Sequence, residues 1–187
     1  MSVKYKRKEL KISDKLMKKI ANFDPVAFEE LYNKASGAVF GLAMSLVANQ
    51  TDAEDIVQET FLTIYKKAKD YNAQGKAMAW IFTITRNHSL MKLRERSKNA
   101  HTNLDDIYDI GSDEDIINET YTENLVNLLL KTLKADERQI VVMHSMSNMK
   151  HKDIADVLDI PISTVISKYN RSLKKLKAEM EVNEYEI

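Results

Sequence analysis

Residues 151–175 read HKDIADVLDIPISTVISKYNRSLKK, and this stretch decides the fold of the second half of the chain. Its first part carries apolar residues at helical spacing: Ile154, Ala155, Val157 and Leu158. A tight turn follows at Asp159–Pro161, because proline cannot continue the preceding helix. A longer helix is expected over residues 163–177, and it is rich in basic residues. Two helices joined by about three residues, the second one basic, predict a helix-turn-helix, although an ordinary helical hairpin has the same pattern.

The second helix of this pair has two different faces. The residues expected to face the core are Val165, Tyr169, Leu176 and either Ser172 or Leu173. The opposite face carries hydroxyl, amine and guanidinium groups, which bond phosphates and base edges in the major groove of DNA. This candidate DNA-reading face consists of Ser163, Thr164, Ser167, Lys168, Arg171, Lys174 and Lys175.

The composition favours an all-α protein. With 187 residues the chain has room for one ordinary domain or two small ones, and 44% apolar residues are enough for a buried core. Only four Gly and two Pro are present, which argues against a β protein with many tight turns. The absence of Cys excludes disulfides, thiolate metal sites and cysteine nucleophiles, and it agrees with a cytoplasmic location.

The sequence contains neither the pattern of a membrane span nor that of a secretion signal. The longest apolar stretch, Ala77–Phe82, is far shorter than the roughly 18 residues that cross a bilayer. Residues 1–20 are charged almost throughout and contain no apolar signal core. We therefore expect a soluble protein of the cytoplasm.

The charges are segregated along the chain although they cancel overall, with 28 basic and 28 acidic residues. Residues 86–98 carry a net charge of +4 and residues 166–178 a net charge of +5, whereas residues 99–123 carry −8. Two basic helical segments on either side of an acidic stretch suggest two surfaces for a polyanion, joined by a linker that repels it. Solvated helix faces that bind nothing remain an alternative for each basic segment taken alone.

Helix signals recur through the first half of the chain. Asp24 and Pro25 are suited to be the N-cap and the first residue of a helix. A second helix is expected over residues 39–47, from the spacing of its apolar residues. Thr51, with Glu54 three positions later, has the pattern of a capping box that opens a third helix.

A fourth helix begins at Ala77, after a polar loop over residues 70–75. Trp80 is expected in its core face, and its distal turns, residues 86–98, are basic. The third helix presents a carboxylate-rich face opposite its apolar stripe, which can be either a binding face or solvated surface. The residues of this face and its apolar neighbour are Asp52, Asp55, Gln58, Glu59 and Leu62.

These observations predict two small helical domains, a four-helix domain and a helix-turn-helix domain, joined by an acidic linker. The expected segments are a basic extension at 1–22, the four-helix domain at 23–98, the linker at 99–122, the helix-turn-helix domain at 123–180 and an acidic tail at 181–187. The extension can be a helix with Leu10, Leu16, Met17 and Ile20 as a partial apolar stripe, or a tail that contacts DNA.

Three stretches in this order resemble the extracytoplasmic-function (ECF) sigma factors of bacterial RNA polymerase. They are DAEDIVQETF at 52–61, AWIFTITRN at 79–87, and DERQ at 136–139 followed by the predicted helix-turn-helix. The resemblance implies an RNA polymerase sigma factor that directs transcription initiation. Its first domain would bind core polymerase and open the −10 promoter element, and its second would read the −35 element. It also implies an anti-sigma factor as a partner.

The resemblance assigns roles to particular residues. The acidic face of the third helix, Asp52, Asp55, Gln58, Glu59 and Leu62, would meet the basic clamp helices of the polymerase. A flipped base of the −10 element would be captured by a loop and the following helix, and the strand backbone would be followed by basic residues. The −10 set is Asn72, Ala73, Gln74, Arg86, Asn87, Lys92 and Arg94. The −35 set is the candidate DNA-reading face already described.

No catalytic, cofactor or metal site is expected. The four His residues are scattered, and no carboxylate is paired with a base or nucleophile. We therefore expect no enzyme activity, no cofactor and no small-molecule substrate.

Two other readings remain: a free-standing helix-turn-helix regulator that uses its first domain to dimerise, and a helical adaptor that binds only proteins. A free-standing regulator has no need of both the acidic helix and the motif at Trp80–Asn87.

Overall fold

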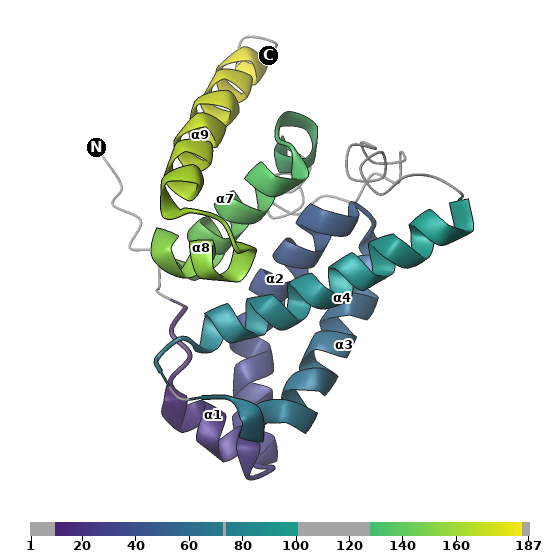
Figure 1. Ribbon diagram of the computed structural model, residues 1–187, viewed down its shortest axis with the longest axis vertical. Helices are drawn as coiled ribbons and strands as arrows, with labels where there is room; N and C mark the ends of the chain where they lie inside the picture. The colour runs from purple at the N-terminus through teal and green to yellow at the C-terminus, as the bar shows by residue number, and fades with distance from the viewer. Residues whose placement is uncertain (1–9, 73, 101–127, 185–187) are drawn as a thin grey trace.

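The computed structural model describes residues 10–72, 74–100 and 128–184 of the chain, and in these residues it contains helices and no strand. The elements are α1 (Asp14–Ala21), α2 (Pro25–Val47), α3 (Gln50–Lys67), the short 3₁₀ helix η1 (Ala68–Asp70), α4 (Ala77–Ala100), α7 (Ala135–Ser147), α8 (His151–Leu158) and α9 (Ile162–Glu184) (Figure 1). Residues 128–132 are also helical. The predicted all-α fold is confirmed. Ala73 and residues 101–122 of the predicted linker lie outside the described residues.

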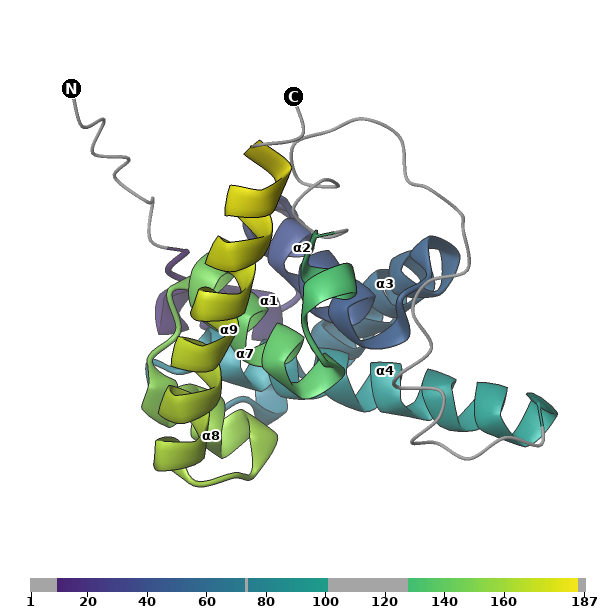
Figure 2. The ribbon, with the colours of Figure 1, turned by 90° about the horizontal axis from the view of Figure 1, so that it is seen from above.

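One long helix, α2, replaces the two helices predicted between Asp24 and Val47. Asp24 is its N-cap, and one carboxylate oxygen accepts hydrogen bonds from the amides of Val26 and Ala27 at 3.0 and 3.1 Å. The helix continues because α2 packs against α3 and α4 and also against α7 (Figures 1 and 2). Its buried residues therefore surround much of the helix, which obscures the single-face pattern expected of a surface helix.

The corner between α2 and α3 is built differently from the predicted capping box. Ala48 adopts the left-handed conformation and ends α2. Asn49 is then the N-cap of α3, because its side-chain oxygen accepts a hydrogen bond from the amide of Asp52 at 3.0 Å. Thr51 lies inside the first turn, so the predicted start of this helix at Thr51 is wrong.

The helix-turn-helix is formed by α8 and α9, with α7 packed against both. α8 ends at Asp159, and α9 begins at Ile162 and continues to Glu184, beyond the range of 163–177 expected for this helix. Ser172 is fully buried and Leu173 is exposed, which settles which of the two faces the core.

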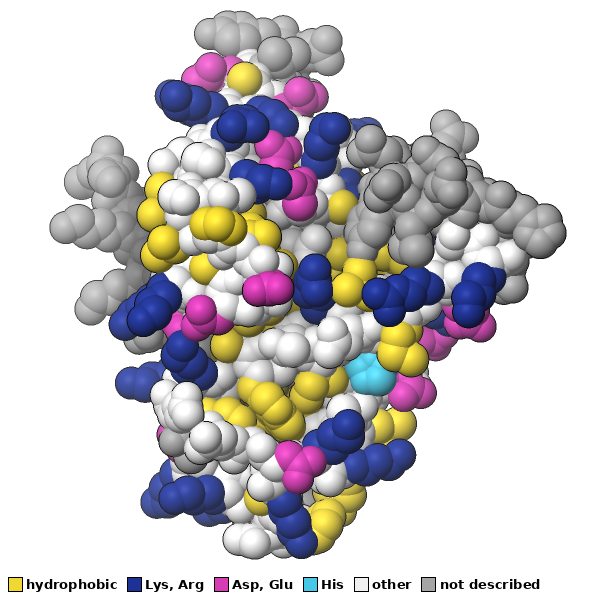
Figure 3. Space-filling view, in the orientation of Figure 1, with side chains coloured by type: hydrophobic (Ala, Val, Ile, Leu, Met, Phe, Trp, Pro, Cys, Tyr) yellow, Lys and Arg dark blue, Asp and Glu magenta, His cyan; other side chains and the backbone are white. Residues whose placement is uncertain are grey.

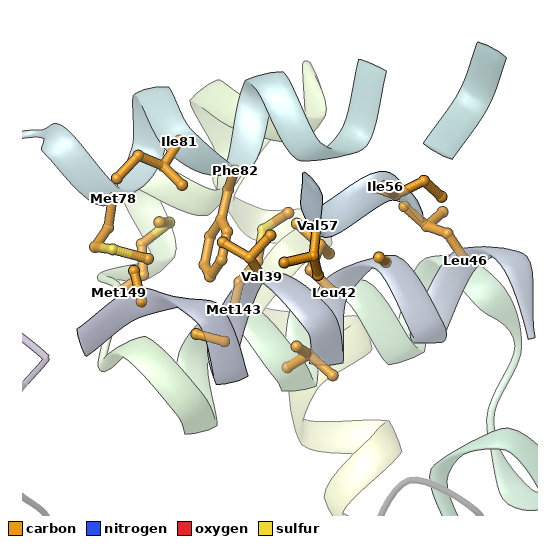
Figure 4. Close-up of a cluster of buried hydrophobic side chains, with 14 of the residues drawn as sticks. Val39, Leu42, Leu46, Ile56, Val57, Met78, Ile81, Phe82, Met143 and Met149 are labelled. Atoms are coloured by element: carbon orange, nitrogen blue, oxygen red, sulfur yellow. The ribbon is translucent and has the colours of Figure 1, made fainter. Parts of the chain in front are cut away.

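A shared core joins the two halves of the molecule. Val39 and Leu42 of α2 lie between Phe82 of α4 and Met143 of α7 (Figure 4). Trp80 packs against this core but remains partly exposed. The two helical domains are therefore in direct contact in this structure.

In the described part of the chain, no helix is long and apolar enough to cross a membrane.

Candidate functional site

The exposed acidic face of α3 consists of Asp55, Gln58 and Glu59, with Leu62 beside them. Leu62 is 50% exposed, so it adds an apolar side chain to this acidic surface. A groove separates this face from α4, and His88 and Met91 contribute to its α4 side. The combination of carboxylates, an amide and one apolar side chain is suited to a basic, partly apolar partner.

Asp52 does not lie on this exposed face, contrary to the sequence prediction. It is only 9% exposed and faces α4. Its carboxylate oxygens lie 2.5 Å from Nη2 of Arg96 and 3.3 Å from Nζ of Lys92. The helical pattern predicted that Asp52 lies on the polar face of the helix. Residue 52 is in the first turn of α3, however, where α4 covers it. The Asp52 carboxylate therefore joins α3 to α4 through ion pairs.

Lys92 belongs to the same ion-pair network. It reaches Asp52, and its Nζ also lies 3.4 Å from a carboxylate oxygen of Asp55. The hydrogen bond to Asp52 raises the pKa of Lys92, with smaller contributions from Asp55. In this structure Lys92 is therefore engaged with α3, although the sequence predicts a contact with the −10 strand.

The loop that joins η1 to α4 carries the residues predicted to capture a base. Asn72 and Gln74 are exposed, and Ala73 lies outside the described residues. Amide side chains can donate to and accept from a base edge, so the exposed loop has suitable chemistry. On α4 itself, Asn87 and Arg94 are exposed. Arg86 is half-buried, and its Nε donates to Oε1 of Gln139 on α7 at 3.3 Å.

The face of α9 predicted to read DNA divides into two sets. Ser163, Ser167, Arg171 and Lys174 are exposed, and Thr164 is half-buried. Lys168 and Lys175 instead lean toward α7, where they pair with Asp136 and Glu137. Figure 3 shows Lys and Arg side chains gathered over the upper part of α9.

Two ion pairs join α9 to α7. Glu137 is 5% exposed, and its carboxylate oxygens lie 2.7 and 2.9 Å from Nζ of Lys175. A buried carboxylate needs such a partner, because an uncompensated buried charge is strongly destabilising. Burial opposes ionisation of Asp136, but the hydrogen bond and the charge of Lys168 outweigh it, so the pKa of Asp136 lies below its usual value.

Polar contacts also connect the two domains. Nζ of Lys76, just before α4, lies 3.0 Å from carboxylate oxygens of Asp153 and Asp156 on α8. The hydrogen bond to Asp156, followed by that to Asp153, raises the pKa of Lys76. Arg138 of α7 donates from Nε to the carbonyl oxygen of Ser45 on α2 at 2.9 Å. These partners lie tens of positions apart in the sequence, and no local pattern could have indicated them.

The described residues contain no group of three or more His, Asp or Glu side chains placed to hold a metal ion. His144 and His151 do meet, with ring centroids 4.8 Å apart, and both contact the ring of Tyr169. This cluster lies inside the helix-turn-helix domain, where the three helices meet.

Comparison with known proteins matches both domains. The chain fits the family models of sigma-70 region 2 over residues 31–99 and sigma-70 region 4 over residues 124–176. It is 25% identical over 178 residues to the ECF RNA polymerase sigma factor SigK of Mycobacterium tuberculosis, covering 91% of this chain and 94% of SigK. It is 28% identical over 156 residues to the ECF RNA polymerase sigma factor SigE of Mycolicibacterium smegmatis, covering 81% of this chain and 60% of SigE.

Two solved structures share the fold. One is CnrH in complex with the cytosolic domain of CnrY, with a TM-score of 0.63 and 21% identity, covering 91% of this chain and 97% of CnrH. The other is the sigma factor RpoE in complex with the anti-sigma factor NepR from Bartonella quintana, with a TM-score of 0.68 and 23% identity, covering 83% of this chain and 97% of RpoE.

Region 2 followed by region 4 is the organisation of a two-region sigma factor, and both matches fall on the observed helical domains. The chain belongs to the ECF family of RNA polymerase sigma factors. Its function is accordingly to direct transcription initiation.

Proposed function

We propose that this sigma factor binds core RNA polymerase through α3, captures the −10 promoter element with the loop before α4 and with α4, and reads the −35 element with α9. The functional regions are then residues 23–98 and 123–180, joined by the acidic stretch at 99–122. The protein acts in the cytoplasm and supplies no catalytic chemistry, which belongs to the polymerase.

The exposed acidic face of α3 is the observation that carries this proposal. Asp55, Gln58 and Glu59 present charge and hydrogen-bond acceptors to solvent, and Leu62 offers an apolar anchor beside them. A basic helical surface on the polymerase would be steered by the carboxylates and fixed in register by Leu62. Asp52 contributes indirectly, because its bonds to α4 hold the start of α3 in place.

The −10 element would meet the front domain at two places. Asn72 and Gln74 present amides at the loop, and Asn87 and Arg94 present polar and basic groups along α4. A base that leaves the stack loses a few kcal/mol of stacking and pairing energy, so a site that is already formed favours opening of the duplex. Arg86 and Lys92 would join this surface once their contacts with Gln139 and α3 are exchanged for DNA.

The −35 element would be read by the exposed set on α9. Arg171 and Lys174, with Ser163, Thr164 and Ser167 near the start of the helix, can reach phosphates and base edges in the major groove. Lys168 and Lys175 would remain paired with α7 and would position the helix.

An anti-sigma factor is the proposed regulatory partner. RpoE, which shares the fold, was solved in complex with the anti-sigma factor NepR. A partner of this kind would cover the exposed face of α3 or the groove beside it, and would so keep the sigma factor from the polymerase.

Run-off transcription tests the proposal. The purified chain is mixed with bacterial core polymerase and a promoter library, and the transcripts are scored. We expect transcription from a subset of promoters, and we expect the variant Asp55→Lys/Glu59→Lys to lose both transcription and co-elution with core polymerase. Lys34→Glu, on the exposed surface of α2, is the charge-changing control.

Two outcomes contradict the proposal. One is an unaltered complex between core polymerase and the double variant while its helix content is that of the wild type. The other is tight footprinting of duplex DNA by the chain alone with no effect on core polymerase, which favours a free-standing helix-turn-helix regulator.

A further inference from the structure

The first helix of the structure lies outside the region 2 match, which begins at residue 31. α1 is nevertheless an integral part of the fold. The hydroxyl oxygen of Ser13 accepts a hydrogen bond from the amide of Leu16 at 3.2 Å and caps the helix. Leu16, Met17 and Ile20 are buried in the common core. Of the two readings of the basic extension, a packed helix is therefore correct for residues 14–21.

Asp14, in the first turn of α1, binds both ends of the loop that carries Asn72 and Gln74. Its Oδ1 accepts a hydrogen bond from the hydroxyl of Tyr71 at 2.7 Å, before these residues. Its Oδ2 accepts one from the amide of Gly75 at 3.0 Å, after them, and a longer contact of 3.3 Å joins the same amide to Oδ1. Gly75 has a φ of +70°, a conformation that glycine adopts without strain.

We propose that Asp14 is a positioning residue for promoter recognition: by tying Tyr71 to Gly75 it holds the intervening loop in the shape that presents Asn72 and Gln74 to the −10 strand. This inference rests on the proposed function of the loop. It assigns a role in promoter opening to α1.

The bonds are suited to this task. Hydrogen bonds to a carboxylate are stronger than those between neutral groups, and one side chain here closes a short loop across its two ends. Burial, and then the hydrogen bond from its hydroxyl to Asp14, raise the pKa of Tyr71 to about 12, so the phenol keeps its proton and donates at neutral pH. A loop ordered in advance loses less conformational entropy when it binds.

The direction of the change in DNA binding when Asp14 is replaced distinguishes a positioning role from a purely electrostatic one. Asp14 is an anionic group close to a surface proposed to bind a polyanion. If its charge alone mattered, replacing it by a neutral residue would strengthen DNA binding. If it positions the loop, the same replacement weakens binding.

The test compares Asp14→Asn with Asp70→Asn, which removes an exposed negative charge next to the loop. Each full-length variant is assembled with core polymerase and titrated with a fluorescent single-stranded −10 oligonucleotide from a promoter recovered in the run-off assay. We expect binding about tenfold weaker for Asp14→Asn, and binding equal to or tighter than wild type for Asp70→Asn. Tyr71→Phe removes one of the bonds and should lie between Asp14→Asn and the wild type.

A spectroscopic readout separates loop position from loss of folding. Trp80 is the only tryptophan, and its ring centroid lies 5.4 Å from that of Tyr71. In the free chain, Asp14→Asn should change the emission of Trp80 while the helix content stays that of the wild type, and Asp70→Asn should not.

Three results decide the matter. Weaker binding by Asp14→Asn with altered Trp80 emission supports the inference. Equal oligonucleotide binding by Asp14→Asn and Asp70→Asn overturns it and leaves the proposed function standing. Failure of the wild-type holoenzyme to bind the −10 strand, measured first, removes the proposed function itself and the inference with it.

Discussion

Asp159 shows how one residue adapts the turn of the helix-turn-helix. Its φ and ψ of 54° and 48° lie in the left-handed region, where it caps the end of α8. Its amide donates to the carbonyl oxygen of Ala155. Asp enters this region more easily than most residues, so the turn forms without a glycine at this position.

Replacing Asp159 tests the cost of this conformation. Asp159→Gly should raise the free energy of unfolding by about 0.5–1 kcal/mol, because glycine adopts positive φ without strain. Asp159→Val should lower it by about 1–2 kcal/mol, because a β-branched residue fits the left-handed region poorly. Urea unfolding followed by circular dichroism measures both. A less stable Asp159→Gly variant would show that the carboxylate, and not the backbone, decides stability at this position.

Residue identity alone did not reveal which charged side chains are available to a partner. Asp52 and Lys175 were both assigned to binding faces, but each is paired with a residue of another helix. Asp55 and Arg171, of the same residue classes and on the same two helices, are exposed. The difference depends on the neighbouring helix, which the local sequence does not describe.

At the scale of elements, three aromatic side chains from three helices meet inside the helix-turn-helix domain. His144 of α7, His151 of α8 and Tyr169 of α9 pack ring against ring, and Nδ1 of His144 lies 2.9 Å from the carbonyl oxygen of Met149. Nε2 of His151 is buried without a hydrogen-bond partner among the described residues. Burial, and then the neighbouring His144, lower the pKa of His151 from 6.5.

The direction of this shift predicts acid sensitivity. Below about pH 6.5 the unfolded chain binds a proton at His151 that the folded domain does not, so stability falls as the pH decreases toward the lowered pKa. We expect the melting temperature to drop less in His151→Gln than in the wild type between about pH 7.5 and about pH 5.5, the range in which histidine titrates. Thermal scans at several pH values measure this. Parallel curves for the two proteins would exclude His151 as the source.

Helices were predicted more successfully than their boundaries. The apolar spacing located α3, α4, α8 and α9, because each buries one main face. It divided α2 in two and began α3 at Thr51 in place of Gln50. The first error arises because α2 packs against partners on several sides. The second arises because a corner residue, Asn49, forms the cap of α3.

At the scale of the whole molecule, the two domains pack against each other through α2 and α7. Gly41 lies at this contact: a Cβ built at this position would lie 2.5 Å from Sδ of Met146, which would have to shift, and 3.6 Å from a methyl carbon of Val142. The polar contacts of Lys76, Arg86 and Arg138 surround this apolar contact. The proposed polymerase face and the proposed promoter surfaces are thus carried on one body.

Gly41→Glu should separate the domains without unfolding them. A buried carboxylate against Met146 and Val142 disfavours the contact, whereas the loss of glycine stabilises α2 itself. Gly37→Glu is the matched control, because a Cβ there meets no atom within 4 Å. Small-angle scattering should give about 16 Å for the radius of gyration of the wild type and the control, as expected for a compact chain of this length, and a larger value for Gly41→Glu. Equal radii for the two variants would show that this contact does not hold the domains together.

The sequence by itself determined the helical class, the order of the two domains and the membership of the sigma-factor family, because apolar periodicity and short motifs are properties of contiguous residues. Only the tertiary structure decided that α2 is one helix and that Asp52 and Lys175 form ion pairs with neighbouring helices. It alone also brought Asp14 into contact with Gly75, which lies 61 positions later in the sequence. An ion pair or a loop contact requires two side chains brought together by packing. The geometry that joins them is set by the whole core and not by either segment.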